Sequence, residues 1–304
     1  MKVKITKNLN EANLVTHTST FHPDDVFSTV LLSKLIDKPV LCRIADPSNA
    51  NKDAIVYDVG FGRFDHHGPD AKKRPNSDIP YCSFGLLWQE YGKEYLRTLN
   101  PVNVDDLWRV MDEKLIKQID AIDNGIFPKI DAEFHLSDLD KIIDLYNKAW
   151  NEDVDNDDQF LLAVDLAEKI FDRFIFKENA RLMANIKVEE ALNEVKDNML
   201  ILKEHMPYEE ALWNSKNPKA KEVKVIIFPS YRGGYSIKPR TVSEDSRDLA
   251  YTFSKEYYGL HDEELIRVSK IPTARFVHSS GFLACANTLE DAIKFAENAI
   301  NNKE

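Results

Sequence analysis

The sequence predicts an α/β fold, in which an N-terminal, mostly parallel sheet flanked by helices precedes a smaller C-terminal α+β domain. Two observations predict it. Short apolar, strand-like runs alternate with helical patterns near the N-terminus, whereas short strands dominate the C-terminal third. Strands that alternate with helices are joined by right-handed crossovers, which make the neighbouring strands parallel. Ligands of such sheets bind beyond the carboxyl ends of the strands, so the residues there are the first candidates for function.

The first block contains three predicted strands and one helix. The strands are predicted at residues 14–16, 40–45 and 54–60, and the helix at residues 24–36. His17 directly follows the first strand, and Asp58 closes the third. Both side chains are therefore expected to project into one crevice at the carboxyl edge of the sheet.

Two further helices are predicted at residues 81–99 and 104–123. The apolar residues of the second helix keep the spacing of a buried helical stripe. Asp120 and Asp123 lie near its end and share one face, because residues three apart are neighbours on a helix. A long helical pattern over residues 159–195 is then the natural connector to the rest of the chain.

The second block is predicted to begin near His205, which divides the chain into a domain over residues 1–204 and another over residues 205–304. The segment 208–222 is polar and lysine-rich, contains one proline and directly follows another, so it is predicted to be a loop or linker. The glycine pair Gly233–Gly234 indicates a hairpin turn. Strands are predicted at residues 223–228, 235–238, 275–278 and 282–286, and a final helix at residues 289–301 with Thr288 as its N-cap.

The acidic charge balance limits the class of partner. The chain has 40 Lys and Arg against 51 Asp and Glu, a net charge of −11, whereas proteins that coat long duplexes show a basic footprint. A short oligonucleotide or a small phosphoester stays compatible, because bound cations can supply positive charge locally. The three separated cysteines fit reduced thiols. We find no leader-like pattern and no membrane span, and we expect a cytoplasmic location.

Histidines and acids gather where the first strand ends and the next helix begins. His17 and His22 lie there with Asp24 and Asp25. Acids in a first helical turn can complement the helix dipole, but this does not explain two histidines beside them. Asp58 stands in an otherwise apolar strand, where a buried unpaired carboxylate needs a cation, hydrogen bonds or an exposed strand end. Mixed imidazole and carboxylate ligands suit Mn²⁺, Fe²⁺ or Zn²⁺ better than Ca²⁺.

The run Asp65-His66-His67 lies in a glycine-rich loop shortly after Asp58. A solvated polar turn would explain this run alone, but its position after Asp58 favours a metal site. Two cations bridged by a carboxylate and a water would make a hydroxide near neutral pH and would clamp a phosphoester oxygen. His66 is then a candidate ligand. His67 is a candidate to contact the phosphate or to protonate the leaving oxygen.

The order of these motifs resembles the DHH phosphoesterase superfamily and, within it, the Myg exonuclease family. The resemblance is carried by THTSTFHPDD (16–25), YDVG (57–60), FDHH (64–67), IDAIDNGI (119–126) and FVHSSGF (276–282). These motifs span nearly the whole chain. The first motif departs from the superfamily's usual H-x-x-x-D-x-D by one extra residue and by His22 where the first Asp stands. This departure is expected to move metal preference toward Zn²⁺ or Fe²⁺.

The resemblance implies a two-metal site in the N-terminal domain, with Mn²⁺ favoured and Mg²⁺, Zn²⁺ and Fe²⁺ left open. It also implies a C-terminal domain that closes over the cleft and holds substrate. The implied metal ligands are His17, His22, Asp24, Asp58 as the bridge, His66, and Asp123 with Asp120 in reserve. The implied substrate contacts are His67, His278, Ser279, Ser280, Gly281, and Arg240 or Arg247, since a guanidinium suits a phosphate.

We therefore expect a metal-dependent hydrolase, a phosphodiesterase that acts on short single-stranded RNA or DNA. The nucleic-acid substrate and the 3′–5′ exonuclease polarity are implied by the resemblance alone. One alternative is a phosphohydrolase for pyrophosphate or a dinucleotide, which the acidic balance fits equally well. Another is a metal-stabilised interaction protein without turnover, which would have a closed coordination shell. A basic stripe with aromatics, for which residues 216–224 are a candidate, would favour a polymer. The oligomeric state stays open, a homodimer included.

Overall fold

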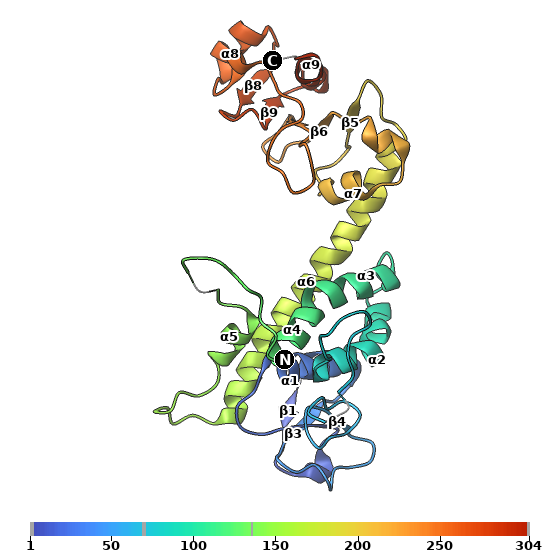
Figure 1. The fold of residues 1–304 in the computed structure, drawn as a ribbon, viewed down its shortest axis with the longest axis vertical. Helices are drawn as coiled ribbons and strands as arrows, with labels where there is room; N and C mark the ends of the chain where they lie inside the picture. The colour runs from blue at the N-terminus through green and yellow to red at the C-terminus, as the bar shows by residue number, and fades with distance from the viewer. Residues whose placement is uncertain (1–2, 69–70, 135, 303–304) are drawn as a thin grey trace. The chain divides into compact units, whose positions relative to one another are not determined.

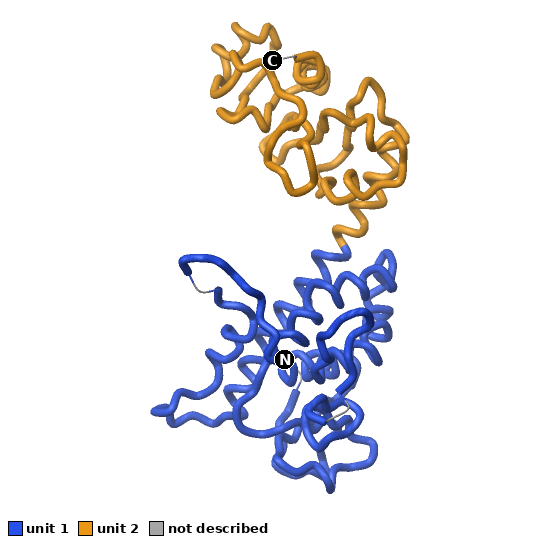
Figure 2. The backbone as a smooth tube through the Cα atoms, in the orientation of Figure 1, with its two compact units in different colours: residues 1–179 blue, residues 180–304 orange. Residues whose placement is uncertain are grey.

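The computed structural model describes residues 3–68, 71–134 and 136–302 and shows an α/β protein (Figure 1). The chain divides into two compact units, residues 1–179 and residues 180–304 (Figure 2). The long helix α6 (Asn156–Leu192) runs from the first unit into the second. The expected division into a metal-binding domain over residues 1–204 and a substrate-binding domain over residues 205–304 stays a prediction.

The first unit contains a four-stranded parallel sheet. Its order is β1 (Lys4–Ile5), β3 (Val40–Arg43), β2 (Leu14–Thr16) and β4 (Ile55–Val56). The predicted N-terminal parallel sheet is thus confirmed, with β1 as a short edge strand that the sequence did not reveal. The predicted strand over residues 54–60 is shorter than expected, because Asp58 has a left-handed backbone (φ 57°) that an extended strand cannot contain.

The helices of the first unit pack next to this sheet (Figure 1). They comprise α1 (Pro23–Leu35), α2 (Ser83–Thr98), α3 (Val104–Met111), a π-helical turn (Asp112–Ile116), α4 (Lys117–Asp123), α5 (Leu139–Asp144) and α6. Helix α1 is buried along almost its whole length and packs against α2. Since α3, the π-turn and α4 follow one another without a break, the predicted helical run over residues 104–123 is confirmed.

An aromatic core fixes α1 and α2 on α6. The ring of Phe171, on α6, contacts Phe27 of α1 and the α2 rings Phe84, Trp88 and Tyr95, with ring centroids 5.9–6.5 Å apart. Such aromatic pairs add about 0.5–1.5 kcal/mol each beyond the area they bury. The first turns of α1 and α2 are therefore held on a rigid base.

The second unit contains a five-stranded mixed sheet. Its order is β5 (Met199–Ile201), β6 (Val225–Pro229), β7 (Tyr235–Pro239), β9 (Ala284–Ala286) and β8 (Ala274–Val277), and only β5 and β6 are parallel. Helices α8 (Asp262–Ser269) and α9 (Leu289–Asn301) share one apolar core with the sheet. The predicted C-terminal α+β unit is confirmed, and Thr288 caps α9 by accepting the Asp291 backbone N–H.

The prediction of a loop or linker over residues 208–222 is wrong. This segment forms the short helix α7 (Glu209–Asn214) and a 3₁₀ turn (Pro218–Lys221). Tyr208, Leu212 and Ala220 are buried in a core shared with the sheet. The few apolar residues are spaced to face this core while the lysines stay outside, so average polarity was a poor guide here.

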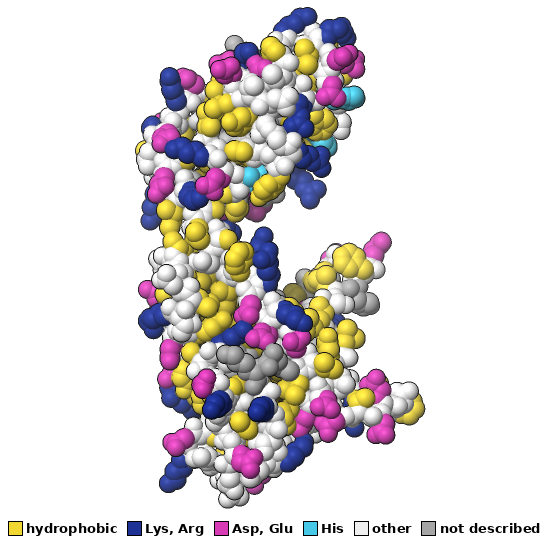
Figure 3. Space-filling view, turned by 180° about the vertical axis from the view of Figure 1, so that it is seen from behind, with side chains coloured by type: hydrophobic (Ala, Val, Ile, Leu, Met, Phe, Trp, Pro, Cys, Tyr) yellow, Lys and Arg dark blue, Asp and Glu magenta, His cyan; other side chains and the backbone are white. Residues whose placement is uncertain are grey.

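The surface mixes both signs of charge. On the face drawn in Figure 3, acidic and basic side chains are interspersed over both units, despite the net charge of −11. Among the described residues, no helix is both long enough and apolar enough to cross a membrane.

Candidate metal centre

The candidate site is built at the carboxyl ends of neighbouring strands. His17 directly follows β2, and Asp58 follows β4 after Tyr57. Helix α1 starts beyond β2 and carries Asp24 and Asp25 in its first turn. This is the edge where the sequence pattern predicts a ligand site, because parallel strands present their loops there together.

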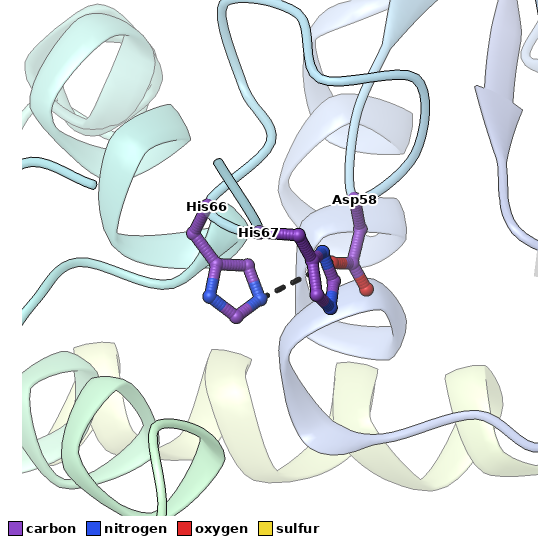
Figure 4. Close-up of side chains that lie close together, drawn as sticks. All are labelled: Asp58, His66 and His67. Carbon is purple, nitrogen blue, oxygen red and sulfur yellow. Dashed lines mark ion pairs between the residues drawn. The ribbon is translucent and has the colours of Figure 1, made fainter. Parts of the chain in front are cut away.

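Asp58 stands at the middle of the site. Its carboxylate is buried, with Oδ2 3.2 Å from His17 Nε2 and Oδ1 3.3 Å from His66 Nε2. Ser83, the first residue of α2, donates a hydrogen bond to Oδ1 at 3.1 Å. Figure 4 shows the His66 and His67 imidazoles next to this carboxylate. The two oxygens of one buried carboxylate thus face two different histidines.

The backbone at Asp58 is held in an uncommon conformation. A positive φ costs a residue with a side chain about 1 kcal/mol or more. The Asp58 N–H donates to the Phe64 carbonyl at 3.0 Å, and Tyr57 pairs with Phe64. The segment that carries Asp65, His66 and His67 is therefore folded back onto the end of β4.

The two adjacent acids of α1 point to different partners. Asp25 Oδ1 accepts the His22 backbone N–H at 2.9 Å, and its Oδ2 lies 3.2 Å from His17 Nε2. Asp24 Oδ2 lies 3.7 Å from His66 Nε2. Successive helical residues project about 100° apart, so neighbouring acids can serve two separate groups of ligands.

Asp123 closes the opposite side of the site. It is the last residue of α4, and its Oδ2 lies 3.1 Å from His66 Nε2. His22, exposed at the N-cap of α1, offers a ligand atom near Asp24 and Asp123. Among the residues that the structure describes, three groups have ligand atoms within 4.8 Å of one another, namely Asp58/His66/His67, His17/Asp25/Asp58 and His22/Asp24/Asp123.

Asp120 is directed elsewhere. It forms a buried ion pair with Arg74, and it accepts the Cys82 backbone N–H at 2.9 Å. Gly85 leaves the room for this carboxylate, since a Cβ at that position would collide with it. The structure therefore brings Asp123, and not Asp120, to the histidines.

His67 is oriented by its neighbour in the motif. Asp65 Oδ1 lies 2.8 Å from His67 Nδ1 and accepts the His67 backbone N–H at 3.0 Å, while its Oδ2 accepts the Phe61 N–H at 2.7 Å. The His67 side chain is 57% exposed, compared with 8% for His66. Nδ1 is thus engaged by the protein, and Nε2 is the ring nitrogen left for another molecule.

The site concentrates negative charge. Burial raises the pKa of Asp24 well above its usual range, and the charges of Asp58 and Asp123 add to this rise. Burial also raises the pKa of Asp123, to about 6. For His17, burial would lower the pKa, but hydrogen bonds to Asp25 and Asp58 outweigh it and raise the pKa to about 11. Acids that destabilise one another in this way would be compensated by bound cations.

The donor set fits a divalent metal. Both carboxylate oxygens of Asp24 are buried and have no hydrogen-bond partner within the described part of the chain. An unpaired buried polar atom costs about 1–3 kcal/mol, and a charged one costs more. Imidazole nitrogens and carboxylate oxygens together suit Mn²⁺, Fe²⁺ or Zn²⁺. The site opens into a cleft of about 720 Å³, which His17, His22, His66 and His67 line.

The other candidate residues lie in the second unit. His278 Nδ1 contacts Ser280 Oγ at 2.8 Å, and the Gly281 N–H donates to the His278 carbonyl. Gly281 has a positive φ (71°) and packs on the Tyr258 ring, so a side chain there would collide with that ring. Ser279 lies within the same turn, which follows β8.

The two candidate arginines differ in their surroundings. Arg240 Nη1 donates to the carbonyls of Ala220 and Val223, and its guanidinium lies 4.1 Å from the centroid of the Trp213 ring. Arg247 is exposed. Arg240 thus already has a structural task in holding the 3₁₀ turn to the sheet.

Sequence reasoning missed two residues of the site. Asp25 was interpreted only as a possible partner of the helix dipole, although it contacts His17. Ser83 was not considered, although it donates to Asp58. The pair Asp24-Asp25 was the available signal for the first, because adjacent acids on a helix cannot both face one ligand. No local signal marks Ser83, whose role depends on where α2 starts.

Comparison with known proteins identifies the family. The family model of the Myg exonucleases, described as an uncharacterised protein family (UPF0160), matches residues 13–300. The chain belongs to this family. It is 26% identical to the MYG1 protein of Dictyostelium discoideum, over 96% of this chain and 98% of that protein. It is 28% identical to the MYG1 exonuclease of Homo sapiens, over 92% of this chain and 84% of that protein.

A solved structure is also similar over most of its length. The pGpG-specific phosphodiesterase PggH from Vibrio cholerae is covered over 96% of its chain, and this chain over 94%, with 14% sequence identity and a TM-score of 0.32. A likeness at that TM-score supports no argument about fold or activity. The family assignment therefore rests on sequence.

Proposed function

We propose that this chain is a metal-dependent phosphodiesterase that hydrolyses short single-stranded RNA or DNA from the 3′ end, with two divalent cations, Mn²⁺ by preference. One observation carries the proposal, which is that the two oxygens of the buried Asp58 carboxylate face two separate histidines, His17 and His66. Membership of a family in which relatives are named MYG1 exonuclease supports a hydrolase of phosphoesters.

The chain's ligands divide into two sets around Asp58. His17, Asp25 and Asp58 would hold one cation. The second cation would be held by Asp24, Asp58, His66 and Asp123, with His22 at the rim. Bound there, the cations would supply an activated water near neutral pH and positive charge opposite the phosphate oxygens.

His67 and Asp65 would handle the substrate. With Nδ1 engaged by Asp65, His67 would present Nε2 to a phosphate oxygen or donate a proton from it to the leaving oxygen. Ser83 would keep the Asp58 carboxylate in one orientation through its hydrogen bond to Oδ1. In the second unit, the turn with His278, Ser279, Ser280 and Gly281, together with Arg240 or Arg247, remains our candidate for holding the rest of the substrate.

A small phosphoester is the second candidate substrate. The net charge of −11 works against long polyanions, and a cleft of about 720 Å³ would accept pyrophosphate or a dinucleotide. A purely structural metal site fits less well. Structural sites have closed coordination shells, whereas four histidines here line an open cleft and His67 is more than half exposed.

The decisive experiment measures turnover by metal-stripped protein. Mn²⁺, Mg²⁺ or Zn²⁺ is added back with end-labelled short RNA, short DNA, a dinucleotide or pyrophosphate. Asp58→Asn and His66→Ala are expected to abolish turnover of whichever substrate the wild type cleaves. Label at the 5′ end, followed over time, would give a ladder that shortens by single nucleotides if cleavage proceeds from the 3′ end.

Asp53→Asn is the matched control, because Asp53 is an exposed acid ahead of β4 and contacts none of the site residues. It should cleave as the wild type does. If the wild type turns over no substrate with any metal, or if Asp58→Asn cleaves as fast as Asp53→Asn, the proposed function is wrong. Turnover confined to pyrophosphate or the dinucleotide would select the second candidate.

A further inference from the structure

One face of the second unit's sheet carries a row of side chains from four strands. The register places Phe228 of β6 opposite Ser236 of β7, Ser236 opposite Cys285 of β9, and Cys285 opposite Phe276 of β8. Residues directly opposite in antiparallel strands point to the same face, so these four side chains form one line across the sheet. Three strand spacings make this line about 14 Å long.

Exposure increases along the row from Phe228 to Phe276. The opposite face of the sheet is buried against α8 and α9. On the row's own face, His205 and Tyr208 cover Phe228, whose residue is only 6% exposed. Phe276 at the other end is 36% exposed. Between the two rings lie two small side chains, the buried Ser236 (6% exposed) and the half-buried Cys285.

A rigid turn places another aromatic ring at the covered end. Tyr231, in the turn between β6 and β7, is 85% exposed and stacks on His205, with ring centroids 4.2 Å apart and planes 22° from parallel. Arg275 Nη1 fastens this turn by donating to the carbonyls of Arg232 and Gly233. The Tyr231 ring is thus held outward by a well-ordered turn, where it buries little of itself against the protein.

Positive charge lies beside these rings. Within the described residues, neither Arg232 nor Arg275 forms an ion pair with a carboxylate. Arg232 directly follows Tyr231 in the turn, and the Arg275 guanidinium reaches the same turn through its hydrogen bonds to the Arg232 and Gly233 carbonyls. In Figure 3, Lys, Arg and His side chains gather along one side of this unit next to hydrophobic ones. Two guanidinium groups without a carboxylate partner among the described residues thus lie at this turn, and one of them, Arg275, also donates to backbone carbonyls.

We propose that this surface, the stacking platform (His205, Tyr231, Arg232, Arg275 and Phe276), binds a single strand of nucleic acid. The bases stack on Tyr231 and Phe276, and the phosphates lie against the two arginines. Exposed aromatics combined with cations are the usual means of holding single strands without sequence preference. This inference rests on the proposed function and selects a polymer as the substrate.

The test compares binding with hydrolysis at several substrate lengths. Metal-free full-length protein is titrated into fluorescein-labelled oligouridylates of two, five and eight nucleotides, and affinity is read by anisotropy. Tyr231→Ala and Phe276→Ala should each weaken binding of the five- and eight-nucleotide probes by about 5- to 150-fold, the loss of one stacked base. Binding and hydrolysis of the dinucleotide should change less than twofold.

Two controls separate stacking from a general loss of structure. Tyr231→Phe keeps the ring and should bind as the wild type does. Phe176→Ala removes a 61% exposed ring that also lies beside an arginine, Arg173, but on α6, and it should leave binding unchanged. The platform is wrong if wild-type affinity does not rise with length, or if Tyr231→Ala binds the eight-nucleotide probe normally. Absent hydrolysis by wild type would instead reject the proposed function, while anisotropy still decides the platform.

Discussion

The candidate metal centre and the proposed stacking platform place polar and aromatic groups in opposite ways. At the metal centre, acids are buried close together, and Asp24 has no hydrogen-bond partner within the described chain. On the platform, the Tyr231 ring is exposed and two guanidinium groups lack carboxylate partners there. Each region therefore has groups that a bound ligand could satisfy. The first needs positive charge, and the second needs aromatic surface and negative charge.

This contrast indicates that binding sites can be recognised by groups that the folded chain leaves without partners. The Asp24 oxygens are buried without a hydrogen bond from the described chain, which costs free energy, and the Tyr231 ring buries little apolar area. Both departures are supported by rigid surroundings, namely the aromatic core around Phe171 and the turn fastened by Arg275. A site that is locally unfavourable but rigidly supported is the expected form of a pre-organised binding site.

The largest expected effect concerns a buried acid that the chain does satisfy. Asp120→Ala should cost about 3–5 kcal/mol of unfolding free energy, because Arg74 would then be buried with one carboxylate partner fewer and the Cys82 N–H would lose its acceptor. Urea denaturation of metal-free protein measures this. Mn²⁺ affinity of the folded variant should stay within about threefold of wild type.

Asp123→Ala is the matched variant, since the two acids are three residues apart on one helix. It should show the reverse pattern, with little loss of metal-free stability and a large loss of Mn²⁺ affinity. If Asp120→Ala weakens Mn²⁺ binding as much as Asp123→Ala does, then the distinction between satisfied and cation-dependent acids is wrong for this region.

A smaller effect tests the uncompensated acids directly. Mn²⁺ at 100 times its dissociation constant should raise the unfolding free energy of the wild type by about 2.7 kcal/mol. Asp24→Asn should lose most of this gain, and its metal-free form should be at least as stable as wild type, because one of several mutually repelling acids is gone. Thermal denaturation with and without Mn²⁺ measures both.

Chelator must reverse the stabilisation, and Asp53→Asn, an exposed acid, must show the full gain. If none of Mn²⁺, Mg²⁺ and Zn²⁺ changes the melting temperature of the wild type, the acids of this region are not a metal site. An Asp24→Asn variant that is strongly destabilised without metal would mean that Asp24 has a partner.

The sequence was a good guide to the first unit because its signals are local. Apolar runs alternating with helical periodicity predicted β2, α1 and β3 closely. The placement of His17 and Asp58 at strand ends followed from the rule for parallel sheets. Asp25 was missed because one acid can cap a helix and face a histidine at once, and only coordinates separate these roles.

The second unit was harder to predict because its important features depend on register. Nothing in the sequence indicates that Phe228, Ser236, Cys285 and Phe276 line up, since that requires the pairing of four strands. Tyr231 was part of a turn that glycines predicted correctly, but its stacking on His205 joins segments far apart in the chain. Distant pairings of this kind cannot be inferred from local periodicity.

The smallest expected effect tests whether the platform's outer ring is there for stability. Tyr231→Ala should change the unfolding free energy by no more than about 0.5 kcal/mol, the range of surface substitutions, because the ring is 85% exposed. Phe228→Ala, which removes the buried ring beneath His205, should cost about 3–5 kcal/mol. Urea denaturation of both variants measures the difference. If Tyr231→Ala lowers the unfolding free energy by more than about 1 kcal/mol, the stacking of Tyr231 on His205 stabilises the fold. The exposed ring would then be explained without a ligand.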